Sequence, residues 1–101
     1  MINIILICAA GMSTSMLMQK MKDSAEKRNL DISVLAMPEG KLDSYKENID
    51  ILLLGPQIMY LEDKIRGIYE EKGVKVAVID MVDYGSMNGD KVLDDALLLL
   101  G

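Results

Sequence analysis

The chain has 101 residues, half of them hydrophobic, which suits one domain with a single core spanning residues 1–101. Eleven basic against sixteen acidic residues give a net charge of -5 without a basic cluster, which argues against a nucleic-acid partner. The single cysteine excludes an internal disulfide and indicates a cytoplasmic protein. No apolar run reaches the roughly 18 residues that span a bilayer, so we expect no direct membrane insertion.

The first half of the chain predicts two strands separated by a helix. Residues 2–7 are almost continuously apolar, as in a strand that is buried on both faces of a parallel sheet. Apolar residues then recur at helical spacing over residues 13–28, with Ser13 or Thr14 as a cap. A second strand begins after Asp31, over residues 32–37, and ends at Pro38, where a backbone donor is lost.

The middle of the chain predicts a third strand and a long helix. After a turn at residues 39–40, residues 42–47 form either a short helix or a loop. Residues 51–54 form a buried strand that stops at Gly55-Pro56, and a helix over residues 57–72 follows and ends at Gly73. Its expected buried face consists of Ile58, Leu61, Ile65, Ile68 and Tyr69.

The last third predicts a fourth strand over residues 74–79, turns at Tyr84-Gly85 and Asn88-Gly89, and a helix over residues 92–100. Strands that alternate with helices predict an α/β fold: one parallel four-stranded sheet, in the order 2-1-3-4, with helices on both faces. Ligands bind such sheets beyond the carboxyl ends of the strands, beside the point where the winding reverses. That point lies between strands one and three, so we expect the loops after both strands to meet there.

The stretch Cys8-Ala9-Ala10-Gly11-Met12-Ser13-Thr14-Ser15 stands at that point. A lone cysteine is often only a small buried hydrophobic residue. Here, however, it follows a strand, the next three residues are small, and a helix start with three hydroxyl side chains comes after them. Unpaired amides and the positive end of a helix bind anions and favour a thiolate. The stretch therefore predicts an anion site with a reactive sulfur.

Residue types that the sequence lacks exclude several kinds of chemistry at this loop. The chain has no histidine, so a Cys-His nucleophile pair cannot form within it. No Lys or Arg stands between Cys8 and Gln19, which excludes the nucleotide-binding phosphate loop, and no second cysteine provides a thioredoxin-type pair. We expect neither a metal nor a cofactor.

Three segments together resemble a known family: residues 8–15, residues 53–58 (Leu-Leu-Gly-Pro-Gln-Ile), and Val78-Ile79-Asp80 with Tyr84-Gly85. The chain is similar over essentially its whole length to enzyme IIB of the lactose/cellobiose (chitobiose) type. That family is the cytoplasmic phosphocarrier of the bacterial phosphoenolpyruvate-dependent sugar phosphotransferase system.

The resemblance implies that Cys8 accepts a phosphoryl group from a phosphohistidine on the IIA component. It then implies transfer to a sugar of the β-glucoside or galactoside type during uptake through the membrane permease IIC. The phosphate would be cradled by Ala9, Ala10, Gly11, Met12, Ser13, Thr14 and Ser15 and bordered by Gly55, Pro56, Gln57 and Tyr84. Met12 is equally compatible with a partner contact and with core filling.

The nearest alternative is a hydrolase like the low-molecular-weight tyrosine phosphatases, whose fold the family shares. Those enzymes use the pattern C-x5-R-[ST], and here Thr14 stands where the arginine would be. Asp80 and Asp83 could serve a phosphatase as general acids, but we interpret them as turn formers. A receiver-like module would need an acceptor Asp where Gly55 stands, and a non-catalytic binding domain would leave the anion-site pattern without a use.

Overall fold

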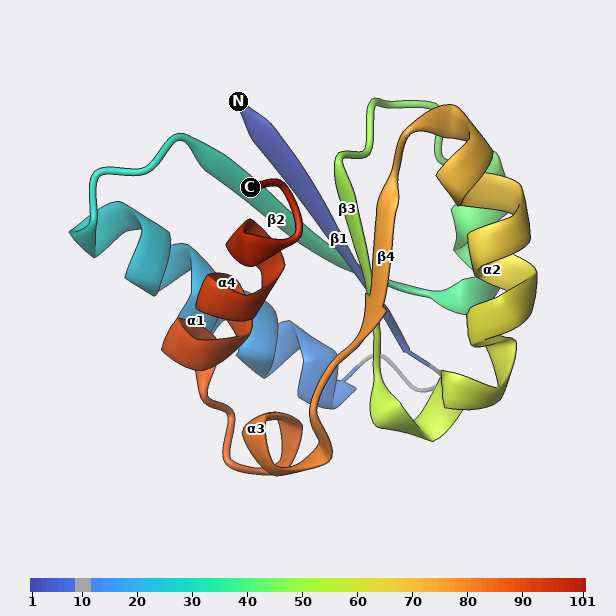
Figure 1. The fold of residues 1–101 in the computed structure, drawn as a ribbon. Coiled ribbons are helices and arrows are strands. Elements are labelled where there is room, and N and C mark those ends of the chain that lie inside the picture. The colour runs from blue at the N-terminus through green and yellow to red at the C-terminus, as the bar shows by residue number, and fades with distance from the viewer. Residues whose placement is uncertain (9–11) are drawn as a thin grey trace.

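The computed structural model describes residues 1–8 and 12–101, and for Met12 and Ser13 only the backbone. Strands alternate with helices along the chain (Figure 1). The strands are β1 (Ile2–Cys8), β2 (Ile32–Pro38), β3 (Ile51–Leu54) and β4 (Lys75–Val78). The α-helices are α1 (Met12–Lys27), α2 (Glu62–Tyr69), α3 (Met81–Gly85) and α4 (Gly89–Leu98), and the 3-10 helices are η1 (Glu39–Ser44), η2 (Pro56–Leu61) and η3 (Glu70–Lys72).

All four strands are parallel and form one sheet in the order β2-β1-β3-β4, which confirms the predicted topology. The register pairs Ile7 of β1 with Leu54 of β3, so Cys8 lies next to the first residue after β3. The winding reverses between these two strands. The expected ligand-binding edge of the sheet therefore carries the cysteine.

Helices cover both faces of the sheet: α1 and α4 lie on one face and α2 on the other (Figure 1). Side chains of β1 alternate between two cores, because successive residues of a strand point to opposite faces. Ile4 and Leu6 pack with α1 and α4, whereas Ile5 and Ile7 pack with α2. This double burial explains why the first strand is apolar at every position from Ile4 to Ile7.

Two predictions for the middle of the chain were wrong in detail. The short helix expected over residues 42–47 is instead η1, which begins at Glu39 where we expected a turn. The long helix expected over residues 57–72 is divided into η2, α2 and η3, with Ile58 in a non-helical conformation at φ -117° and ψ 26°. Ile68, predicted to be buried, is 41% exposed, whereas Ile65 and Tyr69 of the same helix are buried.

The carboxyl-terminal third also differs from the prediction. Tyr84 and Gly85 do not form an open turn but end the short helix α3. The last helix begins at Gly89, three residues before the predicted start, and the side chain of Asn88 caps it by accepting a hydrogen bond from the Lys91 amide. No helix among the described residues is long and apolar enough to cross a membrane.

Candidate active site

Cys8 is the last residue of β1 and is buried, with 2% of its surface exposed. The hydroxyl of Thr14 donates a hydrogen bond to its sulfur, with 2.8 Å between Oγ1 and Sγ. Thr14 is itself fully buried and lies in the first turn of α1. The reactive atom predicted from the sequence therefore lies between a strand end and a helix start.

The described part of the predicted phosphate cradle is this helix start. Met12, Ser13, Thr14 and Ser15 form the first turn of α1, which contains no acidic residue, and the side chain of Ser15 is exposed. The positive end of the helix dipole is therefore close to the sulfur in the chain, which favours an anion there. The remaining predicted cradle residues, 9–11, lie outside the described residues.

A second wall follows β3. The amide of Gly55 donates to the carbonyl of Ile7 at 2.8 Å, which holds the loop after β3 against the end of β1. A Cβ on Gly55 would lie 2.8 Å from Oε1 of Gln57 and 3.7 Å from the ring of Tyr84. Gly55, Gln57 and Tyr84 thus meet at the end of β1, and Pro56 begins η2 between them.

Tyr84 was treated in the sequence as an exposed turn residue, and that was wrong. The side chain is 7% exposed and belongs to the core formed by β1, α1 and α4. Its ring lies 3.7 Å from the position that a Cβ on Gly55 would take, so α3 stands beside the loop that follows β3. Nothing in its sequence neighbourhood signals this contact, which joins residues 29 positions apart.

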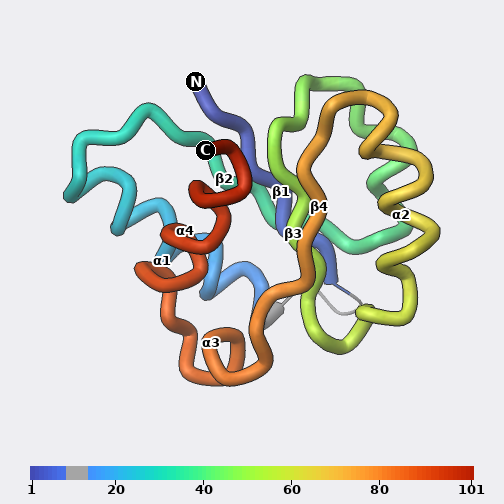
Figure 2. Tube along the Cα trace, in the orientation of Figure 1, coloured from blue at the N-terminus to red at the C-terminus, as the bar shows by residue number. Residues whose placement is uncertain are grey.

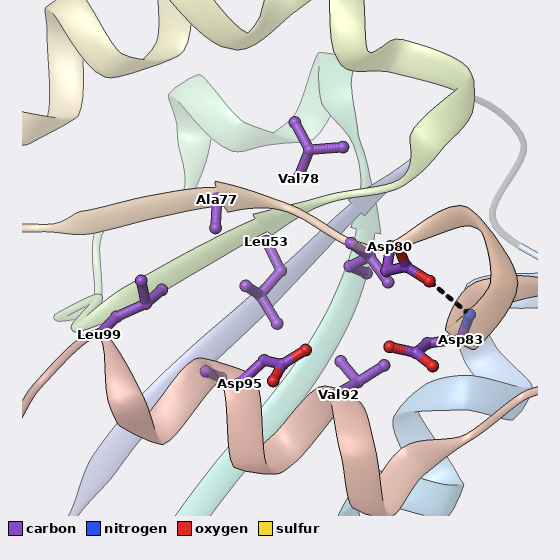
Figure 3. A pocket seen from close by; sticks show the side chains of 10 residues that line it. Leu53, Ala77, Val78, Asp80, Asp83, Val92, Asp95 and Leu99 are labelled. Atoms are coloured by element: carbon purple, nitrogen blue, oxygen red, sulfur yellow. Dashed lines mark hydrogen bonds between the residues drawn. The ribbon is translucent and has the colours of Figure 1, made fainter.

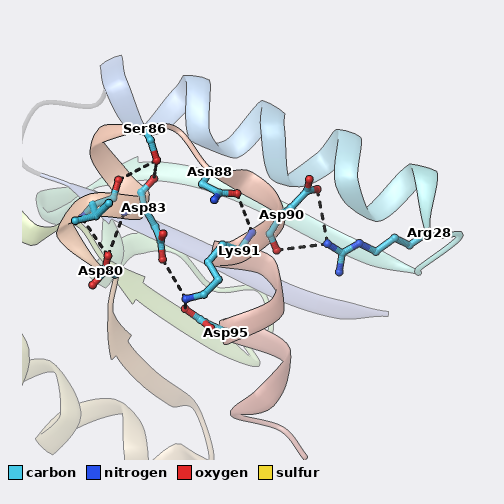
Figure 4. Close-up of polar contacts among 9 residues, drawn as sticks. Arg28, Asp80, Asp83, Ser86, Asn88, Asp90, Lys91 and Asp95 are labelled. Atoms are coloured by element: carbon cyan, nitrogen blue, oxygen red, sulfur yellow. Dashed lines mark hydrogen bonds and ion pairs between the residues drawn. The ribbon is translucent and has the colours of Figure 1, made fainter.

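Asp80 and Asp83 serve structure, as we interpreted them (Figure 4). Asp80 caps α3 by accepting hydrogen bonds from the amides of Val82 and Asp83, at 3.1 and 3.2 Å. Asp83 accepts from Nζ of Lys91 at 3.3 Å, and the same ammonium group contacts Asp95 at 2.9 Å. The pair of Lys91 with Asp83 joins α3 to α4, whereas the pair of Lys91 with Asp95 lies within α4 and the Asp80 cap is local to α3. The sequence analysis missed this contact between the two helices.

A small cavity of about 40 Å³ lies beside this network, between the sheet and α4 (Figure 3). Leu53, Ala77 and Val92 are among the residues that form its apolar wall, and Asp83 and Asp95 stand at its side. Cys8, Thr14 and Gly55 are not among its lining residues. The cavity has room for little more than a few water molecules, so it does not provide a sugar site.

Comparisons with known proteins agree on one family. The model of "PTS system, Lactose/Cellobiose specific IIB subunit" matches residues 3–95. The galactose-specific EIIB component of Lactococcus lactis subsp. cremoris and the cellobiose-specific EIIB component of Lactococcus lactis subsp. lactis are each 41% identical, over 89% of this chain and 88% of theirs. The oligo-beta-mannoside-specific EIIB component of Bacillus subtilis is 34% identical, over 97% and 95%.

Solved structures give the same result for the fold. The cellobiose-specific IIB component of Borrelia burgdorferi is 38% identical, with a TM-score of 0.77 over 97% of this chain and 90% of that one. The lactose-specific IIB domain of Streptococcus pneumoniae has a TM-score of 0.89 over 99% and 98% at 15% identity. YwlE of Bacillus subtilis, which has the low-molecular-weight tyrosine phosphatase fold, has a TM-score of 0.56 over 99% of this chain and 94% of that one, at 15% identity. Because the lactose-specific domain and YwlE are each only 15% identical to this chain, their similarity shows the fold alone. The chain belongs to the lactose/cellobiose-specific IIB family and is a sugar phosphotransferase of the phosphotransferase system.

Proposed function

We propose that Cys8 is the residue that carries the phosphoryl group. The observation that supports this most strongly is the 2.8 Å hydrogen bond from the buried Thr14 hydroxyl to the Cys8 sulfur, at the start of α1. A hydroxyl donor and a helix start both favour a negatively charged sulfur, which is the nucleophilic form. The chain contains no other thiol and no histidine that could take this role.

Two transfers at this sulfur complete the cycle. In the first, the Cys8 thiolate attacks the phosphorus of a phosphohistidine on IIA, the P–N bond breaks and the imidazole leaves. In the second, a sugar hydroxyl held by IIC attacks the same phosphorus, loses its proton, and the P–S bond breaks to restore the thiolate. The bound phosphoryl group adds a charge of roughly -1.5 to -2, which the amides and hydroxyls of residues 9–15 would stabilise with the help of the helix dipole.

A carrier is favoured over a hydrolase by the residue six positions after Cys8. A guanidinium there would stabilise the charge of a phosphoryl group under attack by water, and Thr14 provides no such charge. The two aspartates that a phosphatase could use as acids are occupied as a helix cap and as an ion-pair partner. Slow hydrolysis is what a phosphoryl carrier needs.

We also propose the finer features of this role. The IIA donor and the IIC permease are the partners that the family implies, and a cytoplasmic site of action suits the reduced cysteine. The sugar is of the β-glucoside or galactoside type, since the similar EIIB components are named for galactose, cellobiose and oligo-beta-mannoside. Residues 9–15 cradle the phosphate, and Gly55, Pro56, Gln57 and Tyr84 border it.

The test is phosphoryl transfer from phosphorylated IIA, with the modified residue located by mass spectrometry. We expect one phosphoryl group on Cys8 and none on the Cys8→Ser variant. Labelling of any other residue in that variant would contradict the proposal. As a control for hydrolysis, turnover of an aryl phosphate should be negligible, and rapid Cys8-dependent turnover without acceptance from IIA would favour the phosphatase alternative.

A further inference from the structure

The parallel sheet has two outer strands, β2 and β4, each with a neighbouring strand on one side only in the part of the chain that the structure describes (Figure 2). An outer strand presents backbone N–H and C=O groups with which another chain can pair. β4 has four residues and begins with Lys75, and both a short length and a charge limit such pairing. β2 has seven residues, and its segment 32–37 contains no charged residue, so β2 is the edge more open to pairing.

Hydrogen bonds show which amides of β2 face this open edge. The amide of Ile2 in β1 donates to the carbonyl of Asp31 at 3.1 Å, so the backbone groups of Asp31 and of every second residue after it face β1. The residues between them face the other way. The outward amides of the strand are therefore those of Ile32, Val34 and Ala36.

Two of these three outward amides already have partners within the chain. The amide of Ile32 donates to the carbonyl of Leu30 at 3.1 Å, and the amide of Ala36 donates to the sulfur of Met18, with 3.3 Å between N and Sδ. Pro38, at the end of the strand, has no N–H. A partner strand would therefore find at most one outward amide as a donor on this edge.

The contact of Met18 with Ala36 closes the second half of the edge. Both side chains are partly buried against the core that β1 and β2 form with α1 and α4. A groove of about 460 Å³ runs beside the first half of β2, where residues 32–35 and the α1 residues Lys22 and Glu26 are among those that line it, but Ala36 is not. The edge is therefore accessible along its first half and covered where Met18 packs.

We propose that Met18 guards the open edge of β2 against pairing with the same strand of a second copy of this chain. The partner would be a second copy because residues 32–37 are an uncharged six-residue segment rich in strand-forming side chains, and identical segments of this kind pair with one another. The net charge of -5 lies outside this segment and does not oppose pairing along it. The proposal does not depend on the function proposed above for Cys8.

Hydrogen exchange at the Ala36 amide, followed by NMR spectroscopy, tests the contact itself. Met18→Leu keeps a similar apolar volume and removes the acceptor, so this amide should exchange about two- to tenfold faster than in wild type, the factor that one neutral hydrogen bond contributes. Met18→Gln restores an acceptor on a side chain of similar length and should return the exchange toward the wild-type rate. An unchanged Ala36 exchange rate in Met18→Leu would overturn the proposal.

Sedimentation velocity tests the consequence for association. Met18→Leu should shift to a dimer at concentrations at which wild type remains a monomer. Met16→Leu is the matched control and should stay monomeric, since it makes the same substitution on the same helix at a side chain that is 60% exposed. Adding Leu35→Lys, on a β2 side chain that is 39% exposed, should return Met18→Leu to the monomer, because a charge on an outer strand opposes pairing. A monomeric Met18→Leu, or a dimer that persists with Leu35→Lys, would show that Met18 does not guard this edge.

Discussion

Among single residues, Thr14 determines most of the chemistry at the sulfur. We predict that Thr14→Val slows phosphoryl acceptance by Cys8 roughly tenfold or more, because a hydrogen bond to a charged group is worth about 1.5–3 kcal/mol. The loss should appear at saturating IIA, since the substitution changes the environment of the sulfur and not the binding of the donor. The measurement is the single-turnover rate of Cys8 phosphorylation from phosphorylated IIA.

Thr14→Ser is the control because it keeps the hydroxyl that donates to Cys8. It should retain most of the wild-type rate, and both variants should show wild-type circular dichroism. Equal rates for Thr14→Val and wild type would mean that the hydroxyl does not assist the sulfur, and the helix start would then be the remaining source of its activation.

At the scale of elements, the packing of α1 on α4 depends on Gly89. A Cβ at this position would lie 2.6 Å from the backbone carbon of Lys20 and 2.9 Å from its carbonyl oxygen, so the helices would have to separate. We predict that Gly89→Ala lowers the free energy of unfolding by about 1–3 kcal/mol, as overpacked contacts do. Urea denaturation followed by circular dichroism measures the change.

Replacing Gly67 with alanine should change the free energy of unfolding in the opposite direction. It lies within α2, and a Cβ there would meet nothing within 4 Å. Gly67→Ala should therefore raise the free energy of unfolding by about 0.5–1 kcal/mol through helix propensity alone. A destabilised Gly67→Ala variant, or an unchanged Gly89→Ala variant, would show that the helix packing described here is not the one that determines stability.

For the whole molecule, alkaline stability depends on Tyr69, the last residue of α2, which packs in the core on that face of the sheet. Burial chiefly, and the Asp43 carboxylate secondarily, raise the pKa of Tyr69 above its ordinary value of 10.0. The folded state therefore holds this proton more tightly than the unfolded chain. The resulting stability is fully present below pH 10.0 and is lost as the pH rises through the raised pKa.

We predict that Tyr69→Phe makes the free energy of unfolding fall less steeply between pH 10 and pH 11 than in wild type, as measured by urea denaturation across that range. Phe keeps the ring over which Nζ of Lys72 lies at 5.0 Å, so the two proteins should have similar stability near neutral pH. Tyr60→Phe is the control, because Tyr60 is 76% exposed and should leave the wild-type slope unchanged. The same slope in all three proteins would rule out Tyr69 as the cause.

Local patterns in the sequence were sufficient for the sheet order and for the position of the cysteine. An apolar run such as residues 2–7 has one stable environment, a strand covered on both faces, and alternation with helices then leaves few possible topologies. The helix start after Cys8 was also predictable, because capping depends on residues close together in the chain. Residues four positions apart on a helix are neighbours, and the pair of Glu62 with Arg66, at 2.8 Å, is a local contact of this kind.

Only the tertiary structure decided how distant segments meet. The contact of Tyr84 with Gly55, the ion pair of Asp83 with Lys91, and the division of residues 56–72 into three helical pieces arise from packing between elements. A helical pattern in the sequence did not reveal the break at Ile58, since tertiary packing outweighs local propensity by more than the few tenths of a kcal/mol that separate residue types. The sequence alone therefore determined where the sulfur lies, whereas the fold decided which distant side chains meet around it.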